Sequence, residues 1–243
     1  NRSFKIAAIV GFISILGVVF VGDRQTKNLE IFQPMKLAAA EALTESEDPA
    51  GLSLISIVDE NETVVKELYS LRIPKLLSFL TYNKFSGKVL GINEIQKEYE
   101  AKYGSGDYSP NVFVSYWAFR IMVGLGFLMV FIAALVLLYI YIFKKPLPKK
   151  ILYFFPVVIL MPYLSNTTGW ILTEMGRQPW VVFGYLKTID AVSPNINPGM
   201  VLTSLITFAF VYGVLMIADI YLLQKFAREG LLHETIEAEE KEY

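Results

Sequence analysis

Long runs without a charged side chain dominate the hydrophobic pattern of this chain. Four of them cover residues 6–22, 121–143, 151–173 and 191–218. A bilayer core about 30 Å thick needs about 20 helical residues, so the last three runs qualify directly, and Lys5 can extend the first by snorkelling. No A-x-A-like cleavage site follows residue 22, which argues against a signal peptide. The pattern predicts an all-α integral membrane protein with four transmembrane helices.

Lysines gather in the short segment between the second and third runs. Residues 144–150 contain four of them. Because short cytoplasmic loops of membrane proteins are enriched in Lys and Arg, we expect this loop to lie in the cytoplasm. Four crossings then place both chain ends in the cytoplasm and the two other connecting segments outside.

The predicted segments alternate between membrane and solvent. Transmembrane helices are expected at residues 1–22, 112–143, 151–174 and 199–225, extracytoplasmic segments at 23–111 and 175–198, a cytoplasmic loop at 144–150 and a cytoplasmic tail at 226–243.

The first extracytoplasmic segment is long enough to form a mixed loop domain. Gln33-Pro34 favours a helix that begins there and runs to residue 43. Residues 52–58 have the pattern of a strand, and residues 73–82 and 92–103 have that of amphipathic helices.

Composition supports the membrane class and removes several chemistries. The chain of 243 residues is 54% hydrophobic and 19% charged, against about 45–50% and about 25% in soluble domains. A net charge of −1 gives no electrostatic reason to expect a nucleic-acid partner. Cysteine is absent and His233 is the single histidine, so thiolate and multi-histidine metal sites are excluded within this chain.

Polar side chains near membrane depth are costly and are frequently functional. Thr167, Trp170 and Glu174 are spaced to share one face of a helix, and Arg177 follows one turn later. One interpretation is an interfacial Glu–Arg pair beside a tryptophan belt. The other is a carboxylate that ligates a metal or relays protons, and the spacing alone does not decide between them.

Other candidates flank the predicted spans. Lys36 and Glu41, on the alanine-rich helix after the first span, can hold and deprotonate a lipid-soluble substrate. Arg120 and Met122 begin the second span, where snorkelling and packing are the simple explanations. Asp219, in the last span, is close enough to the cytoplasmic side for hydration to explain it.

Three of these segments, taken together, resemble one family. Gly-Trp-x-x-Thr-Glu-x-Gly-Arg-Gln-Pro-Trp at residues 169–180 resembles the signature of subunit I of cytochrome bd-type quinol oxidases. Gln-Pro-Met-Lys-x-Ala-Ala-x-Glu at residues 33–41 is similar to the quinol-loop helix of that subunit, and Phe-Arg-Ile-Met at residues 119–122 to its haem-ligating segment.

The resemblance implies roles for particular side chains. Met122 would be an axial ligand of the low-spin haem b iron, with Arg120 nearby to balance charge. Glu174 would ligate the iron of a high-spin haem, with Trp170 and Arg177 beside the haems. In the same way, the resemblance gives Lys36 and Glu41 the binding and oxidation of quinol.

Cofactors and reaction follow from the resemblance alone. It implies a low-spin haem b, a high-spin haem b and a haem d, with quinol as the substrate. The family oxidises quinol at the outer face and reduces O2 to water with protons from the cytoplasm, which generates a proton gradient across a bacterial or archaeal cell membrane.

The same resemblance implies partners, because the histidine haem ligands of the family lie on helices that this sequence lacks. We therefore expect the chain to be the C-terminal half of subunit I, of the branch with a short quinol loop. Its expected partners are the N-terminal half of subunit I, the homologous subunit II, a small single-span subunit, and membrane lipid.

Alternatives of other classes remain at this point. The chain can be half of a secondary transporter with Glu174 and Asp219 as ion sites, although no internal repeat supports this. It can also be a structural membrane subunit without chemistry. Within the family, a variant with haem b in place of haem d fits the same motifs.

Overall fold

Among the residues that the structure describes, four helices are long and apolar enough to cross a membrane: Lys5–Phe32, Val112–Ile142, Phe155–Met175 and Pro198–Arg228. They confirm the predicted helical membrane architecture. The computed structural model describes residues 2–59, 65–143 and 153–229 and divides into two compact units, Asn1–Ala191 and Val192–Tyr243. The lysine-rich loop at 144–150 and most of the acidic tail with His233 lie outside the described residues.

The first span is part of a longer helix, α1 (Arg2–Phe32). The helix continues ten residues past residue 22, where its uncharged run ends, and so includes the start of the segment expected as a loop. Local contacts support this continuation, because Lys27 Nζ pairs with Asp23 one turn earlier at 2.5 Å and Thr26 Oγ1 donates to the Gly22 carbonyl at 3.0 Å. Loss of hydrophobicity therefore marks the membrane boundary here, and the helix ends later.

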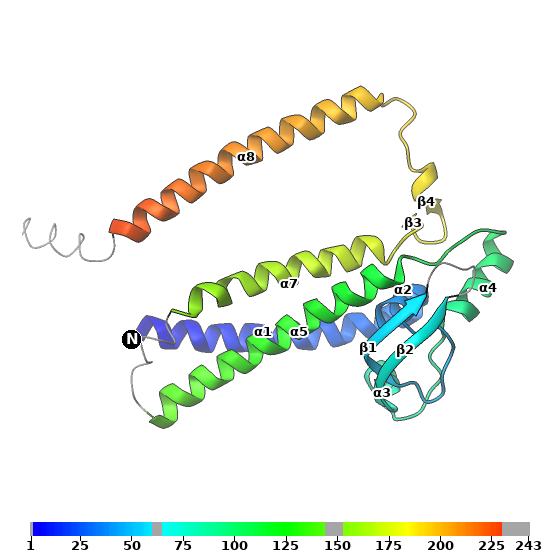
Figure 1. The fold of residues 1–243 in the computed structure, drawn as a ribbon, viewed down its shortest axis with the longest axis horizontal. Coiled ribbons are helices and arrows are strands. Elements are labelled where there is room, and N and C mark those ends of the chain that lie inside the picture. The colour runs from blue at the N-terminus through cyan, green and yellow to red at the C-terminus, as the bar shows by residue number, and fades with distance from the viewer. Residues whose placement is uncertain (1, 60–64, 144–152, 230–243) are drawn as a thin grey trace, which may run out of the picture. The chain divides into compact units, whose positions relative to one another are not determined.

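The second span, α5 (Val112–Leu138), packs against both α1 and the third span, α7 (Phe155–Met175), as Figure 1 shows. Asn111 caps α5 by accepting a hydrogen bond from the Val114 amide at 2.8 Å. A π-helical turn, η1 (Tyr139–Phe143), extends α5 at its other end. Gly169 allows α7 to approach α5 closely, since a Cβ atom at that position would lie 2.8 Å from Met122 Sδ.

Beyond the ends of α1 and α5 lies a small domain, which we call the cap (residues 33–111). It contains α2 (Pro34–Glu41), a hairpin of β1 (Leu52–Asp59) and β2 (Lys66–Ile73), α3 (Leu76–Tyr82) and α4 (Ile92–Tyr103). The strands pair antiparallel. The helix expected at residues 73–82 begins only at Leu76, because Ile73 pairs with Leu52 as the last residue of β2.

Helix α2 is the centre of the cap. Every side chain from Met35 to Glu41 is buried. Consecutive alanines at positions 38–40 are almost wholly inaccessible, and they let α2 lie close to its neighbours; Ala40 packs with Ala118 of α5 and Leu172 of α7. The helix ends at Ala42, which adopts a left-handed conformation with φ 48°.

A second small hairpin follows α7. It consists of β3 (Trp180–Val182) and β4 (Leu186–Lys187), joined through Gly184 at φ 75°, and the short 3-10 helix η2 (Thr188–Asp190) comes next. The second unit contains the fourth span, α8 (Pro198–Glu229), which begins where the Asn197 side chain accepts a hydrogen bond from the Gly199 amide. Asp219 lies within α8.

Candidate functional site

The charged side chains of α2 reach two different transmembrane helices. Glu41 binds Arg120 on α5, and Lys36 donates to a backbone carbonyl at the end of α7. The two α2 residues, expected to act as a pair, therefore contact separate partners. Glu41 lies next to the segment with Arg120 and Met122, and Lys36 lies next to the segment with Glu174 and Arg177.

The Glu41–Arg120 ion pair is deeply buried. Glu41 Oε2 lies 2.5 Å from Arg120 Nη2, and the two side chains are 3% and 15% exposed. Burial raises the pKa of the Glu41 carboxyl above its ordinary value, and the Arg120 guanidinium opposes that rise. Removing one partner of such a buried pair strongly destabilises a protein, because the other charge is left buried without compensation.

Aromatic and hydroxyl groups hold Arg120 in position. Its guanidinium lies 4.8 Å from the centre of the Tyr116 ring and 5.3 Å from that of Phe119. The Tyr116 hydroxyl in turn lies 3.0 Å from Ser53 Oγ on β1. Tyr116 lies one turn before Arg120 on the same helix, whereas Ser53 was not singled out from the sequence, because only tertiary contact connects it to the charged pair.

Lys36 points toward the end of α7. Its ammonium donates to the carbonyl of Thr173 at 3.3 Å, and Gly176 leaves room for its alkyl chain. Burial lowers the pKa of the Lys36 ammonium and the nearby Arg177 lowers it further, while Glu174 raises it. Lys36, expected to bind quinol, and the Glu174–Arg177 pair, expected beside a haem, thus share one electrostatic environment.

Glu174 and Arg177 form an ion pair one turn apart, with Glu174 Oε2 at 2.6 Å from Arg177 Nη2. Both side chains are partly exposed. Trp170, one turn earlier on α7, is 65% exposed among the described residues and presents a flat apolar surface. This geometry agrees with the interpretation of Glu174 and Arg177 as an interfacial ion pair. The Glu174 carboxylate is also accessible to an incoming cation.

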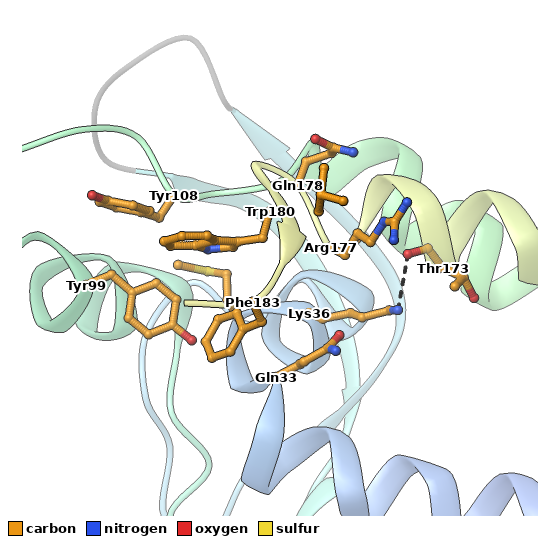
Figure 2. Close-up of a pocket in the computed structure, with 12 residues that line it drawn as sticks. Gln33, Lys36, Tyr99, Tyr108, Thr173, Arg177, Gln178, Trp180 and Phe183 are labelled. Carbon is orange, nitrogen blue, oxygen red and sulfur yellow. Dashed lines mark hydrogen bonds between the residues drawn. The ribbon is translucent and has the colours of Figure 1, made fainter. Parts of the chain in front are cut away.

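Beside Lys36 there is a pocket of about 200 Å³ (Figure 2). It lies between α2, the end of α7, the β3–β4 hairpin, and two tyrosines of the cap. Its lining side chains come from Gln33, Met35, Lys36, Tyr99, Tyr108, Thr173, Arg177, Gln178, Trp180, Val181 and Phe183, together with Gly176.

Unpartnered polar atoms concentrate at this pocket. Buried atoms on four lining side chains have no hydrogen-bond partner among the described residues: Gln33 Oε1, Tyr99 Oη, Arg177 Nε and Trp180 Nε1. Buried polar groups without partners are rare and call for a specific explanation. Three of these atoms can donate a hydrogen bond, and Lys36 adds a cation, so the pocket suits a ligand with acceptor oxygens.

An aromatic wall closes one side of the pocket. Trp180 stacks on Tyr108, with ring centres 5.7 Å apart and an interplanar angle of 17°. Lys187 covers this stack, its ammonium 4.5 Å from the Tyr108 ring centre. The motifs at residues 33–41 and 169–180 contained Gln33, Gln178 and Trp180, but nothing in the sequence pattern pointed to the two tyrosines.

Met122 lies on α5 one half-turn beyond Arg120 and is partly buried against Ala40, Ala118 and Leu172. Its sulfur faces Gly169 of α7, and its carbonyl accepts a hydrogen bond from Ser165 Oγ at 3.2 Å. The thioether therefore has room because position 169 carries no side chain. Asp219, by contrast, belongs to the second unit and is exposed within it.

Comparison with known proteins yields consistent matches. The family model described as "Cytochrome bd terminal oxidase subunit I" matches residues 1–231. The chain is 42% identical over 237 residues to the cytochrome bd ubiquinol oxidase subunit 1 of Bacillus subtilis (strain 168), covering 96% of this chain and 50% of that protein. It is 26% identical over 286 residues to the cytochrome bd-II ubiquinol oxidase subunit 1 of Escherichia coli (strain K12), covering 94% and 55%.

A solved structure matches as well. The bd oxidase from Geobacillus thermodenitrificans superimposes with a TM-score of 0.74 at 30% identity, over 94% of this chain and 50% of that one. The chain thus spans about half the length of these relatives.

Fold and site together define a multi-pass membrane protein whose charged residues meet where a cap joins the ends of its spans. The chain belongs to the cytochrome bd terminal oxidase subunit I family. Membership confirms the resemblance drawn from the three motifs. It also argues against the alternative of a transporter half.

Proposed function

We propose that this chain binds the quinol of a membrane quinol:oxygen oxidoreductase and supplies one iron ligand to each of two haems. The observation that carries the proposal is the position of α2. It contacts α5 through Arg120, two residues before Met122, and α7 through Thr173, one residue before Glu174. A substrate held on α2 would be adjacent to both ligand-bearing segments.

The two charged residues of α2 have different roles toward the quinol. Glu41, as a carboxylate, accepts a proton from a quinol hydroxyl, and burial brings its pKa closer to the working pH of a general base. Lys36 donates a hydrogen bond to a quinol oxygen. Arg120 keeps Glu41 ionised until the proton arrives.

The site fits haem groups at two points. Haem, when bound, carries electrons through its iron. Met122 offers a thioether and Glu174 a carboxylate as iron ligands. Arg177 and Trp180, whose unpartnered donor groups meet at the pocket, would hold a carboxylate such as a haem propionate.

Trp170 would pack against a porphyrin edge. Histidine ligands would come from the other half of subunit I, and assembly with a homologous subunit II and a small single-span subunit is part of the proposal. Matching relatives named as ubiquinol oxidase subunits support the quinol class. The visible absorption spectrum of the assembled complex distinguishes a haem d from a further haem b.

Alanine replacement on α2 tests the proposal. Lys36→Ala and Glu41→Ala should each lower quinol-dependent oxygen uptake at least tenfold in the assembled oxidase, because a hydrogen-bond donor or a general base is lost. The haem spectra should remain unchanged. Lys97→Ala, at an exposed position of α4, is the matched control. Unchanged quinol turnover in both α2 variants would contradict the proposal.

A further inference from the structure

The turn that follows α3 exposes aromatic side chains on the side of the cap next to α1. Phe79 and Phe85 stack with ring centres 4.7 Å apart and an interplanar angle of 15°. Phe85 is 62% exposed, and Phe79 and Leu80 are each 37% exposed. Other side chains of α3, such as Leu77, face the interior of the cap. The helix is thus amphipathic, with an apolar outer face.

Contacts with α1 fix the level of this turn relative to the membrane. Lys27 Nζ donates to Asn83 Oδ1 at 3.0 Å, and the Tyr82 hydroxyl donates to Glu30 Oε1 at 2.9 Å. Lys27 lies five residues past Gly22, the last residue of the uncharged run, which is about 7–8 Å along a helix axis. The headgroup layer on each side of the hydrocarbon core is about 5–7 Å thick. Lys27 therefore lies at the outer edge of the lipid headgroup layer, and the end of α3, which it contacts, borders that layer.

Charge in the same segment suits that location. Lys84 precedes Phe85 directly, and Lys75 precedes α3; both are exposed. Lysines flanking exposed aromatic and aliphatic side chains are typical of segments at a membrane surface, where the cations meet anionic headgroups and the apolar groups enter the acyl boundary. The contacts of Lys27 and Glu30 join the end of α1 directly to residues 82 and 83 beside this patch.

We propose that residues 79–85 form a lipid anchor: Phe79, Leu80 and Phe85 insert into the headgroup layer and tie the cap to the membrane surface. The anchor steadies the cap from a side other than that held by Glu41 and Arg120. Its ligand is a lipid surface, and anionic headgroups strengthen the contact through Lys75 and Lys84. The inference requires only the four spans and is independent of the quinol chemistry.

Depth measurement on the assembled oxidase tests the anchor. Because this chain contains no cysteine, Phe85→Cys introduces one site for a nitroxide label, and Leu80→Cys provides a second. Glu98→Cys, exposed on α4, is the control, and the complex without an introduced cysteine gives the background of the other subunits. The labelled complexes are placed in vesicles of phosphatidylcholine containing a minority of phosphatidylglycerol.

Collisions with oxygen, which concentrates in lipid, are compared with those of a water-soluble nickel chelate. We expect the oxygen-to-nickel accessibility ratio to exceed one at positions 80 and 85 and to fall below one at position 98. Lys75→Gln with Lys84→Gln should reduce the ratio at position 85. A water-like ratio at both 80 and 85 overturns the proposal, and so does shielding from both reagents, which would indicate a protein partner.

Discussion

At the scale of single residues, the spacing of Lys36 and Glu41 determines what each can do. Five residues along an α-helix turn a side chain by about 140°, so two charges on α2 cannot face one neighbouring helix. The structure uses this rotation: Glu41 meets α5 and Lys36 meets α7. Replacing Glu41 should therefore mainly disturb α5, and replacing Lys36 should mainly disturb α7. The two variants should differ in which helix is affected.

Arg120 should set the pH range in which Glu41 works. Burial raises the pKa of Glu41 and the Arg120 cation lowers it, so Arg120→Gln removes the lowering influence and keeps the carboxyl protonated to higher pH. Since a general base must be ionised, the acidic limb of quinol turnover should move upward by about 1–3 pH units. Turnover against pH measures the shift. Arg120→Lys keeps the positive charge and should shift the acidic limb of the pH profile less. An unchanged acidic limb in Arg120→Gln would show that Glu41 is not the general base.

Glu174 is the residue for which the two interpretations differ most. If it ligates iron, Glu174→Ala should lose or perturb a high-spin haem and oxygen reduction, while the low-spin haem remains. If it only pairs with Arg177 at a partly exposed position, the change should cost at most about 1 kcal/mol and leave the haems intact. Haem content and the spectrum with small ligands separate these outcomes. Full haem content with normal oxygen turnover would refute the ligand role.

At the scale of elements, hydrophobic periodicity predicted the spans well but missed the end of the first helix. The uncharged run ending at residue 22 located the membrane, but α1 continues to Phe32 because local pairs such as Asp23–Lys27 suffice to keep charged residues helical. Strand β2 was missed because Arg72, Lys66 and Glu67 make its pattern polar. Arg72 pairs with both Glu47 and Glu67, and this network is invisible in a sequence window.

In the candidate site, too, residues within contiguous motifs were predicted from the sequence, and residues that reach the site by tertiary packing were missed. The motifs contained the charged residues because each motif is contiguous in the chain. They did not contain Tyr99 or Tyr108, which come from other parts of the cap and meet the motifs only through packing. Similarly, the split between Lys36 and Glu41 depends on which helices flank α2.

The contact between α5 and α7 predicts a spectroscopic effect of one methyl group. Gly169→Ala would place a Cβ atom 2.8 Å from Met122 Sδ, so the sulfur must move by several tenths of an ångström or more. If Met122 ligates the low-spin haem, the absorption band of that haem should change and its reduction potential should fall, because a thioether ligand raises the potential. Gly124→Ala is the control, since no described atom lies within 4 Å of its added carbon. Equal spectra for both alanine variants would show that the sulfur does not ligate iron.

At the scale of the whole molecule, sidedness decides where the protons of quinol are released. The lysine-rich loop between the second and third spans predicts that the cap lies on the opposite side of the membrane from the cytoplasm. Protease added to intact, right-side-out vesicles should cut between Lys84 and Lys102 and spare residues 144–150. Disrupted vesicles should expose both sites. Cleavage confined to 144–150 in intact vesicles would reverse the direction of proton release.

Helix α1 behaves as a stiff lever. It runs without a break from Arg2 to Phe32, and only Gln33 separates it from α2. A spanning helix adjusts its tilt to the thickness of the surrounding bilayer, and a rod with no hinge delivers that tilt to whatever is joined to its end. Here the joined element carries Lys36 and Glu41. The length of the lipid acyl chains would then influence where the two side chains proposed to act on quinol are held.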